Sequence, residues 1–147
     1  MAFDAFLKIT DGAGHILIQG ESTDKVHLNE IVIDSFSWGE ANAGQAALQD
    51  FEFTAPTSKA SPLLMLACAT GRRFPEADLT LRKAGGTGQV EFVKIRLLDT
   101  QVSSYNVGGN SGDGLPGDQF TIAFGEIDFK YTVARTGEVV EATYQPV

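Results

Sequence analysis

The chain has 147 residues, a size that fits one domain, 1–147, with a single hydrophobic core. Hydrophobic residues make up 43% of it and charged residues 20%, a composition that excludes an intrinsically disordered protein. Nineteen acidic residues outnumber eleven basic ones, so the formal net charge is −8. We expect no nucleic acid partner and no membrane insertion, because nucleic acids and anionic membrane surfaces attract clustered lysines and arginines.

Cysteine usage and the N-terminus indicate the compartment in which the chain folds. The single cysteine, Cys68, excludes an internal disulfide and is typical of a reducing cytoplasm. The N-terminal MAFDAFLKITDG carries an early acid and lacks an apolar run, so we expect no secretory signal peptide. The longest uncharged apolar stretch, 62–69, is far shorter than the ~20 residues of a membrane-spanning helix. If the protein leaves the cell, we expect another machine to export it.

Short β-strands are the dominant pattern along the chain. Segments rich in Val, Ile, Thr and Phe alternate at period 2 and are separated by glycines. The segment AGGTG at 84–88 lies between two such runs and predicts a hairpin loop. The predicted strands lie near residues 3–9, 15–19, 27–38, 48–54, 78–83, 89–101, 119–133 and 138–144.

One helix is predicted, near 62–70. Ser61 suits its N-cap, Pro62 its first turn and Gly71 its C-terminal end. Its sequence is apolar on almost every side, so we expect a helix buried on most of its surface that plugs or caps a barrel. Cys68 in this helix is expected to be a small core residue, because a reactive thiolate needs exposure and a positive neighbourhood.

Two of the predicted strands change face midway. In 119–133 the apolar alternation changes parity at Gly125, and in 89–101 it changes near Leu97 and Leu98. A β-bulge produces such a change and bends the strand, as a closing barrel requires. We expect these strands to expose apolar groups on both sides and to favour association. The segment 103–118 lacks periodicity and predicts a long loop.

Residues that could carry chemistry are sparse. His15, His27 and Cys68 lack metal-ligand spacing, and the glycine clusters lack the ending of a phosphate loop, so we expect no metal and no cofactor. The acid pairs at 50/52 and 126/128 fit solvated strand faces better than a glycosidase. We therefore expect no catalytic residue. Two alternatives stay open: a small-ligand-binding β-barrel that stays monomeric, and a hydrolase with its site in 103–118.

Several motifs resemble the Hcp family, whose members form the inner tube of bacterial type VI secretion systems. They follow the family's order through most of the chain. The resemblance implies a mainly β fold, a small β-barrel of two packed antiparallel sheets with one short buried helix near 62–70. The motifs are MAFDAFLKI at 1–9, GESTDKVH at 20–27, SFSWG at 35–39, SPLLMLACATGRRFPEADLTLRKAGG at 61–86, QVEFVKIRL at 89–97, VSSYNVGG at 102–109 and FTIAFGEIDFKY at 120–131.

The resemblance also implies a function, that of a structural subunit and not an enzyme. Copies of the chain would close into hexameric rings, and the rings would stack into a tube inside a contractile sheath. The implied partners are other copies of the chain, the sheath, the spike and the effectors that the tube carries or chaperones. The implied location is extracellular, reached through the type VI apparatus after synthesis in the cytoplasm.

Two surface features are candidates for the implied contacts. Alternation over 31–39 places Ile31, Ile33, Ser35 and Ser37 on one face and Val32, Asp34, Phe36 and Trp38 on the other. Phe36 and Trp38 are predicted to anchor the core, which leaves Ser37 facing the lumen, where it would contact effectors. A solvent-facing serine without a role is the alternative. The loop 39–47 is small and polar and is predicted to reach from one ring to the next. Its candidate stacking residues are Gly39, Glu40, Asn42 and Gln45.

Overall fold

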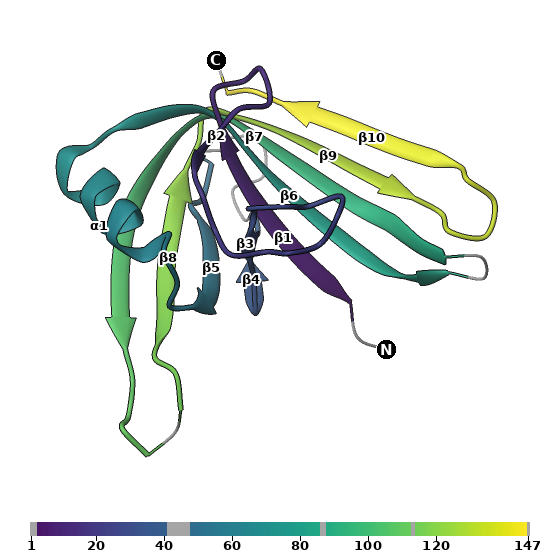
Figure 1. Cartoon of the computed structure of the whole chain (residues 1–147). Coiled ribbons are helices and arrows are strands. Elements are labelled where there is room, and N and C mark those ends of the chain that lie inside the picture. Colours follow the sequence, from purple (N-terminus) through teal and green to yellow (C-terminus); the bar gives the residue numbers. More distant parts are fainter. Residues whose placement is uncertain (1–2, 41–47, 86–87, 113, 147) are drawn as a thin grey trace.

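The chain folds into an antiparallel sheet that bends around a core, with a helix, α1 (Ser61–Thr70), packed against it (Figure 1). The computed structural model describes residues 3–40, 48–85, 88–112 and 114–146. The mainly β fold that the sequence predicts is confirmed. Within the described residues the strands are β1 (Asp4–Thr10), β2 (Ile16–Ile18), β3 (Ile31–Val32), β4 (Ser35–Ser37), β5 (Phe51–Pro56), β6 (Arg73–Gly85), β7 (Gly88–Gly108), β8 (Gly117–Ala123), β9 (Glu126–Thr132) and β10 (Val139–Tyr144).

The longest strand, β7, joins the two layers of the sheet. Its first part lies between β6 and β9, and its last part pairs with β8. The change of partner falls at Asp99, which has a φ of 56°, and at Gly125, whose backbone N–H donates to the carbonyl of Leu98. The predicted changes of face at these places are confirmed. The single strand predicted for 119–133 is wrong, because the chain crosses from one layer to the other there and forms β8 and β9.

The segment 31–37 connects the two remaining edges of the sheet. Its first half, β3, pairs with β1, and the N–H of Ile33 donates to the carbonyl of Ala5. The N–H of Asp34 then donates to the carbonyl of Thr54, and β4 pairs with β5. Backbone hydrogen bonds therefore run around the whole core, from β1 through β6, β7, β8 and β5 and back. The two predicted layers are parts of one continuous sheet.

Phenylalanines fill the space between the layers. Phe51, Phe53, Phe74 and Phe120 are almost completely buried. The ring of Phe53 stacks on those of Phe51 and Phe120, with centroids 4.9 and 5.3 Å apart. They come from alternate positions of β5 and β8, which is why the period-2 pattern predicts these strands correctly. The rings occupy the space that a ligand-binding barrel would leave open.

Helix α1 differs from the prediction at its start and in its burial. Its N-cap is Ala60, and Ser61 is the first helical residue, with a hydroxyl that donates to Asp118. Gly71 ends the helix at a φ of 67°, as predicted. Of the ten helical residues only Ser61, Leu64 and Ala67 are buried. The predicted burial on most sides is therefore wrong for the single chain, which covers one face of the helix.

The long loop predicted for 103–118 is shorter in the structure. Strand β7 continues to Gly108 and pairs with β8 from Gly117, so the loop spans 109–116. The register of the pair shifts between Val102 and Ser104. This irregularity interrupts the alternation of apolar and polar residues and conceals the strand from a period-2 search. The hairpin predicted at 84–88 is confirmed by the pairing of β6 and β7.

Candidate functional site

Ser37 lies on an exposed polar face of the sheet. On β4, β5, β8 and the last part of β7, the side chains that point away from the phenylalanine core are mostly polar and uncharged, with Glu52 as a charged exception. Two of their hydroxyl pairs are hydrogen-bonded, Ser35 to Thr54 at 2.5 Å and Ser104 to Thr121 at 2.6 Å. Such a surface is hydrated and carries little charge. The polar face consists of the cross-strand rows Ser37–Glu52–Thr121–Ser104 and Ser35–Thr54–Gln119–Asn106.

The aromatic neighbours of Ser37 point the other way, as predicted. The rings of Phe36 and Trp38 stack on Phe51 at centroid distances of 6.2 and 6.1 Å. The continuous alternation predicted for 31–39 is wrong, however, because Ile31 and Ile33 are buried and do not share the exposed side of Ser37. The alternation of buried and exposed side chains reverses at Asp34, where the chain stops pairing with β1 and starts pairing with β5.

The candidate stacking loop leaves the sheet directly after Trp38. Gly39 and Glu40 are exposed, and a carboxylate oxygen of Glu40 accepts a hydrogen bond from the backbone N–H of Gln49 at 3.3 Å. The indole N–H of Trp38 donates to the backbone carbonyl of Gln49 at 2.8 Å. These two bonds hold the ends of the loop together at the sheet. The other candidates, Asn42 and Gln45, lie outside the described residues.

The β9–β10 hairpin carries an uncovered apolar surface that the sequence prediction did not locate. Because cross-strand partners share a face, the apolar side of this hairpin extends the buried side of β7 past the core. Its large side chains are 40 to 60% exposed. We call Phe129, Tyr131, Val140, Ala142 and Tyr144 the hairpin face. Its rows are Leu97–Ile127–Tyr144, Ile95–Phe129–Ala142 and Val93–Tyr131–Val140.

The opposite side of the same strands is charged. A cross-strand row of alternating sign runs from β1 to β10, in the order Lys8–Asp78–Arg96–Asp128–Thr143. The pKa of Asp78 is raised to about 7, mainly by burial and in part by the neighbouring Glu76 carboxyl, whereas Lys94 and Lys8 oppose the rise. The Thr143 hydroxyl donates to Asp128 at 2.6 Å and is the main cause that lowers the pKa of Asp128. The hairpin is therefore amphipathic.

A buried polar cluster fastens the segment between β2 and β3 to the sheet. The ring of His27 stacks on Phe6 at 4.4 Å, with Nδ1 3.0 Å from Glu30 and Nε2 2.7 Å from Glu91. Burial raises the pKa of Glu30. The strand predicted from residue 27 onwards is wrong for 27–30, because His27 is held against the sheet by Phe6, Glu30 and the distant Glu91.

Arg82 adds a second fastening beside this cluster. Its guanidinium donates to Asp24 at 2.9 Å and to Asp4 at 3.2 Å, and it lies over the ring of Phe6. The hydrogen bond from Arg82 is the main cause that lowers the pKa of Asp24 to about 2. The cluster is explained by this structural role. Among the described residues no group of three His, Cys, Asp or Glu could hold a metal ion.

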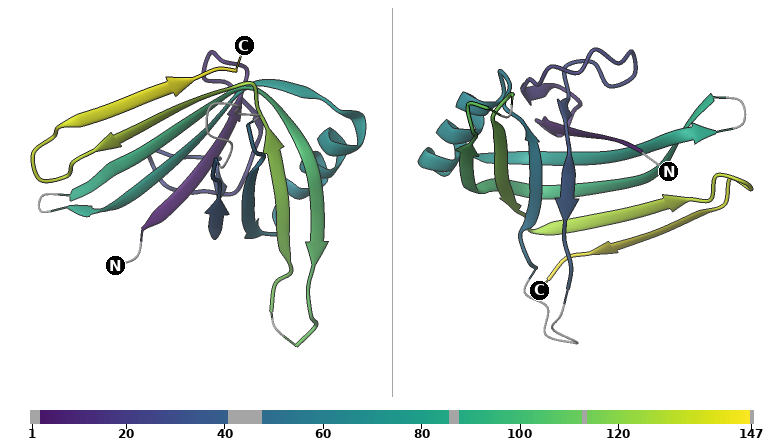
Figure 2. Two further views of the ribbon diagram at one scale, coloured as in Figure 1. Left: turned by 180° about the vertical axis from the view of Figure 1, so that it is seen from behind. Right: turned by 90° about the horizontal axis from the view of Figure 1, so that it is seen from below.

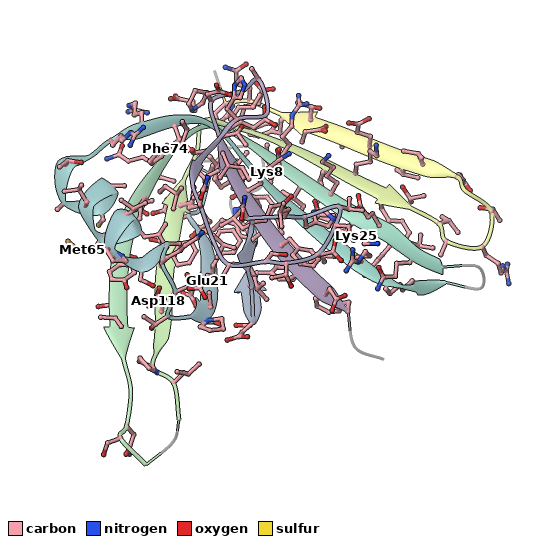
Figure 3. All side chains as sticks on the ribbon, viewed as in Figure 1. Lys8, Glu21, Lys25, Met65, Phe74 and Asp118 are labelled. Atoms are coloured by element: carbon pink, nitrogen blue, oxygen red, sulfur yellow. The ribbon has the colours of Figure 1, made fainter. Side chains whose placement is uncertain are left out.

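Helix α1 presents the third surface. Leu63, Met65 and Leu66, which we call the helix face, are 44 to 53% exposed, and Met65 points away from the sheet in Figure 3. Below the helix, Asp118 accepts hydrogen bonds from the hydroxyls of Ser61, Thr57 and Tyr105. In the part of the chain that the structure describes, no helix is long and apolar enough to cross a membrane.

Comparisons with known proteins agree on one family. The family model described as type VI secretion system effector, Hcp, matches residues 6–131. Protein hcp1 of Pseudomonas aeruginosa is 38% identical over 144 aligned residues, which cover 89% of this chain and 84% of that protein. Hcp1 from Salmonella typhimurium superposes with a TM-score of 0.83 at 35% identity, covering 99% of this chain and 95% of that one. A type VI secretion system effector from Yersinia pestis gives the same TM-score at 29% identity, covering 97% and 100%.

Proposed function

The chain belongs to the Hcp family of type VI secretion proteins, and from this premise we propose that it builds the secretion tube. Copies close into hexameric rings, the rings stack inside a contractile sheath, and the tube is exported with its effectors. The role is structural, since the features above supply contact surfaces and a rigid wall. A contact between two different patches of one chain generates a ring when its rotation closes.

The hairpin face is the observation that carries this proposal. Five apolar residues on two neighbouring strands lie side by side, and a charged side lies directly behind them. Soluble monomers rarely keep a contiguous apolar patch of this kind in water, because burying it yields about 25 cal/mol per Å². A second copy of the chain covers the patch, and the polar side of the hairpin stays hydrated.

Two adjacent valines on β10 provide a matched test. Val140 lies on the hairpin face and Val139 on the polar side, and both are at least half exposed. Val140→Glu buries a charge in the contact and should abolish rings, whereas Val139→Glu should leave them intact. Native mass spectrometry of dilute protein measures the outcome as a species of six times the chain mass of 15.7 kDa. A monomer in the unmutated protein, or an equal effect of both variants, would contradict the proposal.

The polar face is proposed to line the lumen and to contact effectors through Ser37. Its exposed position and the hydroxyl-rich surface around it support this assignment. Ser37→Gln should therefore leave rings intact and weaken effector retention, measured by co-purification of an effector with the rings. Thr143→Gln on the charged side of the hairpin is the control. Equal retention by wild type and Ser37→Gln would remove Ser37 from the effector contact.

The loop that begins at Gly39 is proposed to join one ring to the next, with Glu40, Asn42 and Gln45 as its other contacts. The exposure of Gly39 and Glu40 and the closure of the loop at Gln49 support this assignment. Glu40→Lys should reduce tubes seen by negative-stain microscopy and preserve rings in native mass spectrometry. Loss of the rings themselves would place the loop in the ring contact instead.

A further inference from the structure

The helix face is an apolar surface that the described residues of the same chain leave exposed. All ten residues of α1 are uncharged, and those that point outward include Leu63, Met65 and Leu66. A helix that is apolar all round is typical of a buried element. Between the helix and β2 lies a groove with a volume of about 120 Å³. The groove is lined by Leu17, Ile18, Leu63, Leu66, Ala67, Thr70 and Arg72.

The charges around the two uncovered surfaces are opposite in sign. At the C-terminal end of α1, Arg72 and Arg73 are exposed, and the Arg72 guanidinium lies 4.7 Å from the Phe74 ring. On the hairpin, Glu138 is exposed directly before β10 and has the same parity as Val140 on the hairpin face. In a chain with a net charge of −8, an uncharged helix beside two arginines is an unusual surface. It complements an apolar hairpin face that begins beside an exposed glutamate.

The two surfaces also lie at opposite ends of the molecule. Figure 1 shows α1 at one end of the sheet and the tip of the β9–β10 hairpin at the other, and both views of Figure 2 show the same separation. One copy therefore cannot cover its own hairpin face with its own helix. Two different patches at opposite ends of a molecule are typical of a head-to-tail contact. In such a contact, one patch of each copy binds the other patch of the next copy.

We propose that the helix face and its groove receive the hairpin face of the next copy of the chain. This inference rests on the proposed ring assembly and names the two surfaces that meet in it. Leu66 and Met65 pack against Val140 and Tyr144 of the neighbour, and Arg72 lies beside the neighbour's Glu138. The contact buries both apolar patches and pairs two charges, those of Arg72 and Glu138, that are exposed in the single chain.

Cysteine cross-linking tests the contact directly. In a Cys68→Ala background, Met65→Cys or Leu66→Cys is combined with Val140→Cys or Tyr144→Cys. A bismaleimide reagent then joins the thiols, since it tolerates distances longer than a disulfide does. Head-to-tail pairing predicts a ladder of covalent species up to the hexamer on denaturing gels, because every copy offers both thiols. Val139→Cys, on the other side of β10, replaces Val140→Cys in the matched control and should give no ladder.

The outcomes separate this inference from the proposed function. Native mass spectrometry of the same variants shows whether rings form. Rings without a ladder in all four combinations would overturn the helix–hairpin contact and leave the tube function standing. A monomer, with no ring in the unmutated protein either, would instead contradict the tube function. A covalent dimer from Met65→Cys alone would mean that helices pair with helices, which also overturns the proposed contact.

A charge exchange provides an independent readout. Arg72→Glu places a negative charge opposite the neighbour's Glu138 and should raise the dissociation constant of the ring at least tenfold. Adding Glu138→Arg to the same chain should restore at least half of the lost hexamer at a fixed concentration. Circular dichroism of each variant checks that the sheet is folded. Failure of Glu138→Arg to restore any hexamer would contradict the proposed charge pairing.

Discussion

Replacing Asp78 by asparagine should stabilise the fold above neutral pH and have little effect in acid. Asp78 lies on β6 and is 6% exposed, and its Oδ1 has no hydrogen-bond partner among the described residues. Burial is the main cause that raises the pKa of this carboxyl from 3.8 to about 7. Glu76 contributes to this rise, and Lys94 and Lys8 oppose it. The folded protein therefore holds a proton that the unfolded chain releases.

The size of the effect follows from the pKa of Asp78. The rise from 3.8 to about 7 corresponds to about 4 kcal/mol, at about 1.36 kcal/mol per pKa unit. The stability that the bound proton provides is fully present below pH 3.8 and is lost as pH rises through about 7. Asparagine cannot ionise, so Asp78→Asn avoids this loss. Its advantage over the wild type should be small at about pH 4 and approach about 4 kcal/mol at about pH 8.

Urea unfolding followed by the fluorescence of Trp38, the single tryptophan, measures this difference. Protein concentration is kept constant, because assembly of the folded chain adds to its apparent stability. Asp34→Asn, an exposed position, is the control and should change the unfolding midpoint little at either pH. An equal effect of Asp78→Asn at both pH values, or a loss of stability at pH 8, would refute the reasoning. It would mean that Asp78 is ionised in the fold and stabilised by Lys8 and Lys94.

Two further predictions concern the backbone and the core. Gly20→Ala should destabilise the fold by several kcal/mol in urea unfolding, because a Cβ there would lie 2.4 Å from the carbonyl oxygen of Glu30. Gly39→Ala, where a Cβ meets nothing within 4 Å, should be neutral, and equal effects would contradict the packing. Phe53→Ala should cost about 3–5 kcal/mol of folding stability. Phe129→Ala should instead lower the hexamer fraction in native mass spectrometry with little effect on folding.

Local patterns in the sequence predicted most of the sheet because the alternation directly reports one buried side of each strand. The β6–β7 hairpin and the reversals near Leu97 and Gly125 were accessible for this reason. The separation of β8 from β9 was not accessible. The same reversal of parity results from a strand that bends at a bulge and from a chain that crosses between layers. Only the partners of β7 distinguish the two cases.

The segment before β3 could not be predicted from its own residues. His27 begins an apparently alternating run, yet its ring nitrogens bind carboxylates of Glu30 and Glu91, and Asn29 adopts a positive φ of 65°. Sequence proximity could have suggested the bond between His27 and Glu30. The bond to Glu91 joins residues 64 positions apart, and a single sequence carries no signal for it. The outward orientation of Ser37 was predicted correctly from its neighbours Phe36 and Trp38. The orientation of Ile31 and Ile33 was not, because the change of pairing partner from β1 to β5 depends on residues distant in the sequence.

The wrong prediction for α1 is the most informative one, because the pattern that failed in the single chain fits the proposed ring. A helix without a charged residue is expected to be buried on most sides, yet six of its ten residues are exposed. The same conflict occurs on the hairpin face, where rows that begin in the core end in solvent. Conflicts between pattern and burial are expected where a functional surface lies. Both are removed together if one copy's helix covers the next copy's hairpin, so the hydrophobic pattern describes burial in the assembly and not in the monomer.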